Sequence, residues 1–168
     1  MPTLPYAFDV EIVTLLASPL HRYEGRPKDG PAAFDGVETH ESVMVRAGLG
    51  IVGDRFFGLR AHRQEAVTLF AIESLEAVAA ELATGELDVA KTRRNVILRG
   101  YPVDELRGST FRLGEVEFVA HRPANPCAWM DEQLAPGAFR ALRKRGGMRC
   151  EPVTDGVLRL GLTTLEVL

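Results

Sequence analysis

Five side chains in the second half of the chain are the main candidates for chemistry. Arg94 and Asn95 come just before one apolar stretch, and Arg122, Asn125 and Cys127 come just after another. A guanidinium offers a planar set of donors that suits phosphate or carboxylate, and an amide adds a neutral donor. A thiolate is a nucleophile and a soft metal ligand. These residue types suit a site that binds an anion beside a reactive sulfur, with Cys127 as candidate nucleophile and metal ligand.

The apolar stretches around these residues have the composition of β-strands. Residues 96–98, 111–113 and 116–120 are rich in β-branched, aromatic and aliphatic side chains, and Gly114-Glu115 predicts a tight hairpin between the last two. The polar candidates therefore stand at strand ends. In a closed barrel the strand ends form a rim, where segments distant in sequence reach the same ligand.

Cys127 lies in a loop with two prolines. Pro123 and Pro126 remove backbone donors and restrict the chain, which predicts a stiff loop that holds the thiol at the rim. The alternative is a small buried hydrophobe, the usual role of a free cysteine. Cys150 lies within a strand-like run, and we expect it to be structural.

Two further segments have side chains suited to anions. Thr92 adds a hydroxyl beside Arg94 and Asn95, although a basic strand start is more often a solvated sheet edge. Asp54-Arg55 follows a glycine-rich turn, where Arg55 is a candidate anion contact and the alternative is a turn held by the Asp54 side chain. The charged loop over 18–36 contains His21 and is long enough to be either functional or a mobile insertion.

Composition limits the class of protein. The 168 residues suit one domain, with 46% hydrophobic residues, 26% charged residues and a net charge of −3. That charge gives no reason to expect nucleic-acid binding. No signal peptide or apolar run long enough to cross a bilayer is present, so we expect a cytoplasmic protein with no membrane association. Two cysteines are too few for a disulfide framework; one bridge between them is the alternative to the free thiols expected in a reducing compartment, and no structural zinc site is expected.

The rest of the pattern predicts a mostly β fold with two or three peripheral α-helices. Strand-like runs cover 8–17, 43–46, 68–70, 149–153, 157–160 and 163–167. Apolar residues at helical spacing predict one helix over 71–82, and a shorter helix is expected over 136–145.

In its ordered motifs the sequence resembles the MOSC domain family, named for the C-terminal domain of molybdenum-cofactor sulfurases. The motifs are Gly50-Ile51-Val52-Gly53-Asp54-Arg55, Arg94-Asn95, residues 106–114, Asn125-Pro126-Cys127 and, as a closing hairpin, residues 155–161. The resemblance covers nearly the whole chain and is closest to the small stand-alone bacterial members. It implies a β-barrel.

The resemblance also implies a pterin-based molybdenum cofactor. Arg94 and Asn95, with Thr92 more weakly, match the segment that holds the cofactor's phosphate and pterin in the family; Arg55, Arg122 and Asn125 are further candidate contacts. Cys127 matches the family's cysteine, which carries sulfur or ligates molybdenum. The sequence departs from the stand-alone relatives at Phe56, where they commonly have His, and at His62-Arg63-Gln64, where they often have His-Gly-Gly.

Three functions follow from the resemblance. The first is reduction of N-hydroxylated compounds with electrons from a separate reductase. The second is a sulfur carrier, in which Cys127 holds a persulfide received from a sulfur donor protein. The third is a binding module for an anion or cofactor, without turnover.

Overall fold

Strands make up most of the protein. The computed structural model describes residues 6–168, and its strands are β1 (Tyr6–Leu15), β2 (Ser42–Arg46), β3 (Gly50–Ile51), β4 (Val67–Ala71), β5 (Val96–Arg99), β6 (Thr110–Leu113), β7 (Val116–Pro123), β8 (Met148–Pro152), β9 (Gly156–Arg159) and β10 (Gly161–Val167). The α-helices are α1 (Ile72–Leu82), α2 (Trp129–Gln133) and α3 (Ala138–Ala141). Four 3-10 helices complete the list: η1 (Pro27–Asp29), η2 (Arg60–Glu65), η3 (Val89–Thr92) and η4 (Val103–Leu106).

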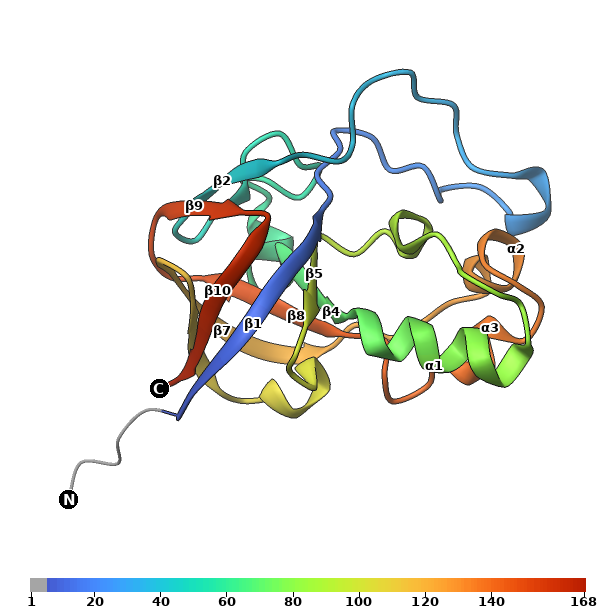
Figure 1. The fold of residues 1–168 in the computed structure, drawn as a ribbon. Helices are drawn as coiled ribbons and strands as arrows, with labels where there is room; N and C mark the ends of the chain where they lie inside the picture. The colour runs from blue at the N-terminus through green and yellow to red at the C-terminus, as the bar shows by residue number, and fades with distance from the viewer. Residues whose placement is uncertain (1–5) are drawn as a thin grey trace.

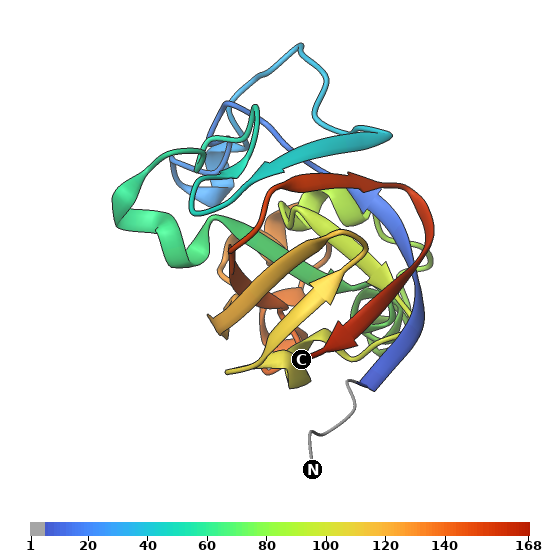
Figure 2. The same cartoon turned by 90° about the vertical axis from the view of Figure 1, so that its left-hand side faces the viewer.

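Seven strands close into a barrel in the order β1-β10-β6-β7-β8-β4-β5, and β3, β2 and β9 form a smaller sheet. Figures 1 and 2 show β1 and β10 side by side along the barrel wall. The predicted β-barrel with two or three peripheral α-helices is therefore confirmed.

The strand arrangement explains why a helix lies between β4 and β5. Neighbouring barrel strands are antiparallel except β4 and β5, which are parallel. A parallel pair needs a crossover connection, and α1 supplies it between these two strands. The three α-helices gather on one side of the barrel in Figure 1, where the segment over 16–41 also arches from β1 toward α2.

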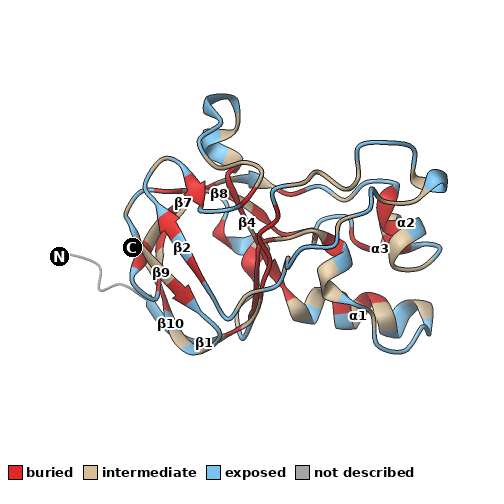
Figure 3. Ribbon diagram, turned by 90° about the horizontal axis from the view of Figure 1, so that it is seen from above, coloured by how far each residue is buried: buried red, intermediate tan, exposed pale blue. Residues whose placement is uncertain are grey.

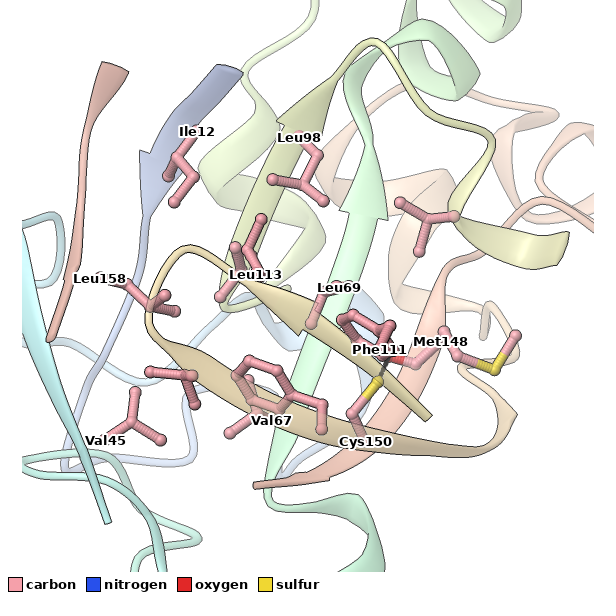
Figure 4. Close-up of a cluster of buried hydrophobic side chains, with 14 of the residues drawn as sticks. Ile12, Val45, Val67, Leu69, Leu98, Phe111, Leu113, Met148, Cys150 and Leu158 are labelled. Carbon is pink, nitrogen blue, oxygen red and sulfur yellow. Dashed lines mark hydrogen bonds between the residues drawn. The ribbon is translucent and has the colours of Figure 1, made fainter. Parts of the chain in front are cut away.

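Alternating strand residues supply two apolar cores. Leu69 of β4 and Leu98 of β5 point into the barrel, whereas their neighbours Phe70 and Ile97 pack against the helices. Figure 4 shows the barrel interior, where Cys150 lies among aliphatic and aromatic side chains. The thiol is fully buried, and burial raises its pKa, as expected for the structural role predicted for it. In Figure 3 the buried residues are concentrated in the strands, and the loops are largely exposed.

Two predicted elements differ in the structure. The helix expected over 136–145 is only the single turn α3: Gly137 directly before it has φ 95°, and Lys144, three residues after its end, has φ 66°, and neither conformation continues an α-helix. A second short helix, α2, directly follows the Cys127 loop and was not predicted. The closing segment over 155–161 is no simple hairpin either, since β9 pairs with β2 in the small sheet and β10 pairs with β1 and β6.

None of the helices in residues 6–168 has the length and apolar character needed to cross a membrane.

Candidate functional site

A cavity of about 270 Å³ lies where the end of β1, the turn after β3, the segment before β5 and the loop after β7 meet. Six of the seven predicted site residues line it: Arg55, Thr92, Arg94, Asn95, Asn125 and Cys127. These six residues come from three separate ranges of the sequence, 55, 92–95 and 125–127, and they reach one space because the barrel brings the corresponding strand ends together. Arg122 is the predicted residue that the structure leaves outside.

Cys127 is an exposed, free thiol in the wall of this cavity. Its loop is held at both ends by backbone hydrogen bonds: Ala124 N–H donates to the Gly147 carbonyl (2.9 Å), and Met130 N–H donates to the Cys127 carbonyl (3.0 Å). The second bond begins α2. The alternative of a buried structural cysteine therefore applies to Cys150 and not to Cys127.

Arg94 directs its guanidinium at the protein backbone. Nε donates to the Gly146 carbonyl (2.8 Å) and Nη2 donates to the Ala124 carbonyl (2.9 Å), with longer contacts from Nη1 to Thr92 O (3.3 Å) and from Nη2 to Asn125 O (3.4 Å). Burial lowers the pKa of Arg94 to about 10, so the group stays charged at neutral pH. Most of its donors are thus used within the chain.

Asn95 is buried and similarly satisfied. Its Nδ2 donates to the Leu16 carbonyl (2.9 Å) and to Asp54 Oδ1 (3.3 Å), and its Oδ1 accepts from the backbone and hydroxyl of Thr68 (2.9 and 3.0 Å). Thr92 is also buried, and its hydroxyl donates to Val89 O (2.7 Å). Asn95 therefore joins the end of β1, the start of β4 and the turn after β3, whereas the Thr92 hydrogen bond stays within η3.

Asp54 and Arg55 differ in whether their side chains form hydrogen bonds within the protein. Asp54 Oδ1 accepts from the Ser18 backbone (3.3 Å) and Oδ2 accepts from the Phe56 backbone (3.3 Å), as in a turn held by its side chain, and burial raises the pKa of this carboxyl. The Arg55 guanidinium lies 4.5 Å above the Phe56 ring, and within residues 6–168 no carboxylate or carbonyl accepts a hydrogen bond from it. Burial, together with the nearby charge of Arg93, lowers the pKa of Arg55. This guanidinium faces the cavity with its donors open.

The long loop after β1 contributes a histidine. His21 lines the cavity, and its Nδ1 accepts a hydrogen bond from the Tyr23 backbone (3.2 Å), which places the proton of neutral His21 on Nε2. Burial and the neighbouring Arg55 charge lower the pKa of His21, which favours that neutral form. His21 thus offers one further donor beside Arg55.

Aromatic stacking and ion pairs fasten this loop over the cavity. Tyr23 stacks on Trp129 of α2, with ring centroids 4.5 Å apart, and its hydroxyl donates to Lys91 O (2.6 Å). Glu38 pairs with both Arg22 (2.9 Å) and Arg93 (2.8 Å). Burial alone would raise the pKa of Glu38, but the hydrogen bonds from these arginines outweigh it and hold the pKa at about 2.

Arg122 and Arg149 come from facing positions of β7 and β8, yet only Arg149 lines the cavity. Arg149 pairs with Glu65 (2.8 Å), and burial lowers its pKa. Arg122 also pairs with Glu65, but it lies in a separate surface depression with Arg63 and His121. The predicted contact between Arg122 and a ligand of the cavity has no support in this geometry. Asn125 is exposed at the cavity wall.

Several cavity residues were not among the predicted site residues: His21, Tyr23, Arg93, Trp129 and Arg149. His21 was noted only as a residue of the charged loop over 18–36. His21 and Tyr23 lie in a loop whose path no local pattern determines, and Arg149 lies in a strand whose pairing partner had to be known. The only usable signal was the length and charge of the loop over 18–36.

The arrangement suits an anionic ligand next to a thiol. Open donors on Arg55 and His21 and an exposed Cys127 border the same space. Among residues 6–168, no three His, Cys, Asp or Glu side chains gather closely enough to hold a metal ion by themselves. A metal in this cavity would therefore need ligands from a cofactor in addition to Cys127.

Similarity to solved structures supports the fold. The YuaD protein from Bacillus subtilis superimposes with a TM-score of 0.77 at 15% identity, covering 98% of each chain. YiiM from Escherichia coli has a TM-score of 0.61 at 19% identity, covering 98% of this chain and 70% of that one. YiiM from Geobacillus stearothermophilus has a TM-score of 0.64 at 16% identity, covering 95% and 75%. These identities show a shared fold alone.

No curated protein sequence gives a significant match. The MOSC domain family, by contrast, matches residues 52–163, a range that begins before β4, ends within β10 and includes both Arg94-Asn95 and Cys127. Since this match covers more than half of the sequence and the barrel agrees with it, the chain belongs to the MOSC domain family.

Proposed function

We propose that the protein binds the pterin-based molybdenum cofactor in this cavity, with Cys127 as the protein ligand of the metal. The observation that carries the proposal is the pairing of an exposed thiol with an open guanidinium, Arg55, around one cavity. Membership of the MOSC family supports the choice of cofactor.

The residues present fit such a group. The cofactor's phosphate is an anion, and it would satisfy donors of Arg55 and His21 that have no acceptor among the described residues. An anion here would also offset the mutual repulsion that contributes to the lowered pKa of Arg55. The thiol of Cys127 is a soft donor suited to molybdenum, whose remaining sulfur ligands the pterin itself would provide.

The residues that line the cavity then have two kinds of role. Arg55 and His21 are the proposed phosphate contacts, with Arg149 adding positive charge nearby. Arg94, Asn95 and Thr92 line the same cavity and leave few donors for the ligand.

When bound, the cofactor would supply a two-electron redox centre. We propose reduction of N-hydroxylated compounds as the reaction, with electrons delivered by a separate reductase. His21 would donate a hydrogen bond from Nε2 toward the ligand, and the Tyr23–Trp129 stack would limit access of water from the loop side.

A second candidate is a sulfur carrier, favoured by the exposure of the Cys127 thiol. A thiol that a partner protein can reach is a requirement for accepting and passing on a persulfide. A sulfur donor protein would then replace the reductase as partner.

The test is elemental analysis of protein purified from a cofactor-producing host. Wild type is expected to contain near-stoichiometric molybdenum, and Cys127→Ser is expected to lose most of it. Cys150→Ala is the matched control, since it removes a thiol buried in the barrel and should retain the metal. With the metal established, turnover of an N-hydroxylated substrate with an added reductase tests the reaction.

Equal molybdenum in wild type and Cys127→Ser would contradict the ligand role of Cys127. Absence of molybdenum from freshly purified wild type, together with an added sulfur atom on Cys127 in intact-mass analysis, would favour the sulfur carrier instead.

A further inference from the structure

We propose that Arg94 and Gly146 form a clamp that fixes the Cys127 loop, and that Arg94 is a positioning residue for the thiol and not a ligand contact. The inference rests on the proposed function in one respect: it takes Cys127 as the working group of the site. The clamp itself is a property of the protein without any ligand.

The hydrogen bonds of Arg94 join three separate parts of the chain. Four of its five N–H groups point at carbonyl oxygens, those of Thr92, Ala124, Asn125 and Gly146. Thr92 belongs to the segment before β5, Ala124 and Asn125 to the Cys127 loop, and Gly146 to the segment before β8. A planar guanidinium can serve several acceptors at once, whereas a lysine ammonium at the same position cannot reproduce the fork.

Gly146 completes the clamp by close packing. A Cβ added at this residue would lie 2.3 Å from the Ala124 oxygen and 3.1 Å from Pro126 Cδ. Gly146 is not among the glycines with positive φ, so the absence of a side chain is needed for this approach and not for an unusual backbone conformation. The Cys127 loop therefore rests directly on the Gly146 backbone.

The neighbouring residue ties the same loop to the barrel. Gly147 accepts from the Ala124 backbone (2.9 Å), donates to Asp104 Oδ1 (3.0 Å), and approaches Leu69 of β4 so closely that a Cβ would lie 2.3 Å from the Leu69 oxygen. The clamp and Gly147 thus fix the Cys127 loop to the strands of the barrel and limit its movement. Such support matters because a reacting or metal-binding group loses much of its effect when displaced by about 1 Å.

Arg55 shows what a ligand-facing arginine looks like in the same cavity. Its guanidinium lies over Phe56 and has no acceptor among the described residues. The contrast assigns the two arginines to different tasks.

The test uses the ligand-free protein, in which a residue that only contacts the ligand would not affect the mobility of the Cys127 loop. Hydrogen exchange followed by mass spectrometry is compared between wild type and Arg94→Lys, which keeps the charge but loses the fork. We expect exchange in the peptide over 124–130 to speed up by about tenfold, with β4 and β5 unchanged. A nitroxide label on Cys127 should show increased mobility in the same variant; the buried Cys150 would not react.

Gly146→Ala provides a second variant that leaves Arg94 intact, and it should loosen the same peptide because its Cβ meets the Ala124 oxygen. Arg55→Lys is the matched control, with loop exchange expected at the wild-type rate. Unchanged loop exchange in both clamp variants would overturn the proposal, and so would a uniform increase across the barrel, which would indicate general destabilisation.

Failure of the proposed function is distinguishable from failure of the clamp. Wild type without molybdenum but with a local response to Arg94→Lys would reject the cofactor and keep the clamp. Wild type that contains molybdenum, together with no local response to Arg94→Lys, would keep the cofactor and reject the clamp.

Discussion

Two walls of one cavity use the same kinds of side chain in opposite ways. On one wall, Arg94 and Asn95 donate to carbonyls and side chains of the protein itself. On the other, Arg55 and His21 present donors that have no acceptor among the described residues. Both walls are basic or polar, and both belong to the cavity that Cys127 also lines.

Residue type alone therefore does not reveal whether a donor bonds within the protein or remains available to a ligand. A donor satisfied within the fold contributes stability and fixes geometry, whereas an open one is available to a ligand at some cost in stability. A substitution on the first wall should mainly affect folding, and one on the second should mainly affect binding.

The largest effect is expected from Asn95→Ala. The change leaves Thr68, Asp54 and the Leu16 carbonyl with missing partners in a buried setting, so the free energy of unfolding should fall by about 3 kcal/mol. Urea denaturation measures it. Asn125→Ala, at the exposed edge of the cavity, is the control and should stay within about 0.5 kcal/mol of wild type. Equal losses in the two variants would erase the distinction between the walls.

A smaller effect is expected from Glu38→Gln, which loosens the loop that carries His21. The folded-state pKa of Glu38 is about 2, below its ordinary value, so its contribution is present at neutral pH and is lost as the pH falls toward 2. Allowing for partial exposure, the free energy of unfolding at pH 7 should fall by about 1–2 kcal/mol.

The difference between wild type and Glu38→Gln should then vanish in acid, which denaturation at a series of pH values would show. A constant difference down to pH of about 2 would contradict the assigned pKa.

Arg55→Ala should separate binding from stability. The free energy of unfolding should change by less than about 1 kcal/mol, because the lost contact with Phe56 is offset by removal of a partly desolvated charge. The affinity for inorganic phosphate, measured by calorimetry, should fall about tenfold. Arg159→Ala, an exposed arginine outside the cavity, is the matched control. Unchanged phosphate affinity in Arg55→Ala would remove the second wall from the ligand site.

The smallest effect concerns the titration of His21. Burial and the Arg55 charge lower its pKa, so NMR titration should find it below that of an exposed histidine, and Arg55→Ala should raise it. Because the folded-state pKa is lowered, protonation opposes folding, and stability should decline slightly as the pH falls through the histidine range. No change in the His21 titration in Arg55→Ala would mean that the two groups do not share the open wall.

Much of the fold was predictable from local pattern. Alternation in residues 8–17 and the apolar run at 96–98 predicted β1 and β5, and helical spacing over 71–82 predicted α1, since burial of one face repeats with a period that the sequence displays. The pairing of β9 with β2 was not predictable in this way, because strand composition does not identify the partner. The short α2 lacks the length that a periodic pattern needs.

For the candidate site, residue types and motifs were enough to pick segments that meet at one place: six of the seven predicted residues line the cavity. Their hydrogen-bond partners depend on the tertiary fold. Asn95 and the Leu16 carbonyl are 79 residues apart in sequence, and Arg94 and Gly146 are 52 apart, so neither hydrogen bond leaves a local trace. The side of the strand on which Arg122 emerges, and the path that brings His21 to Arg55, depend likewise on how the barrel closes. The residue type fixes which hydrogen bonds a side chain can make, but the fold determines which partners lie within reach.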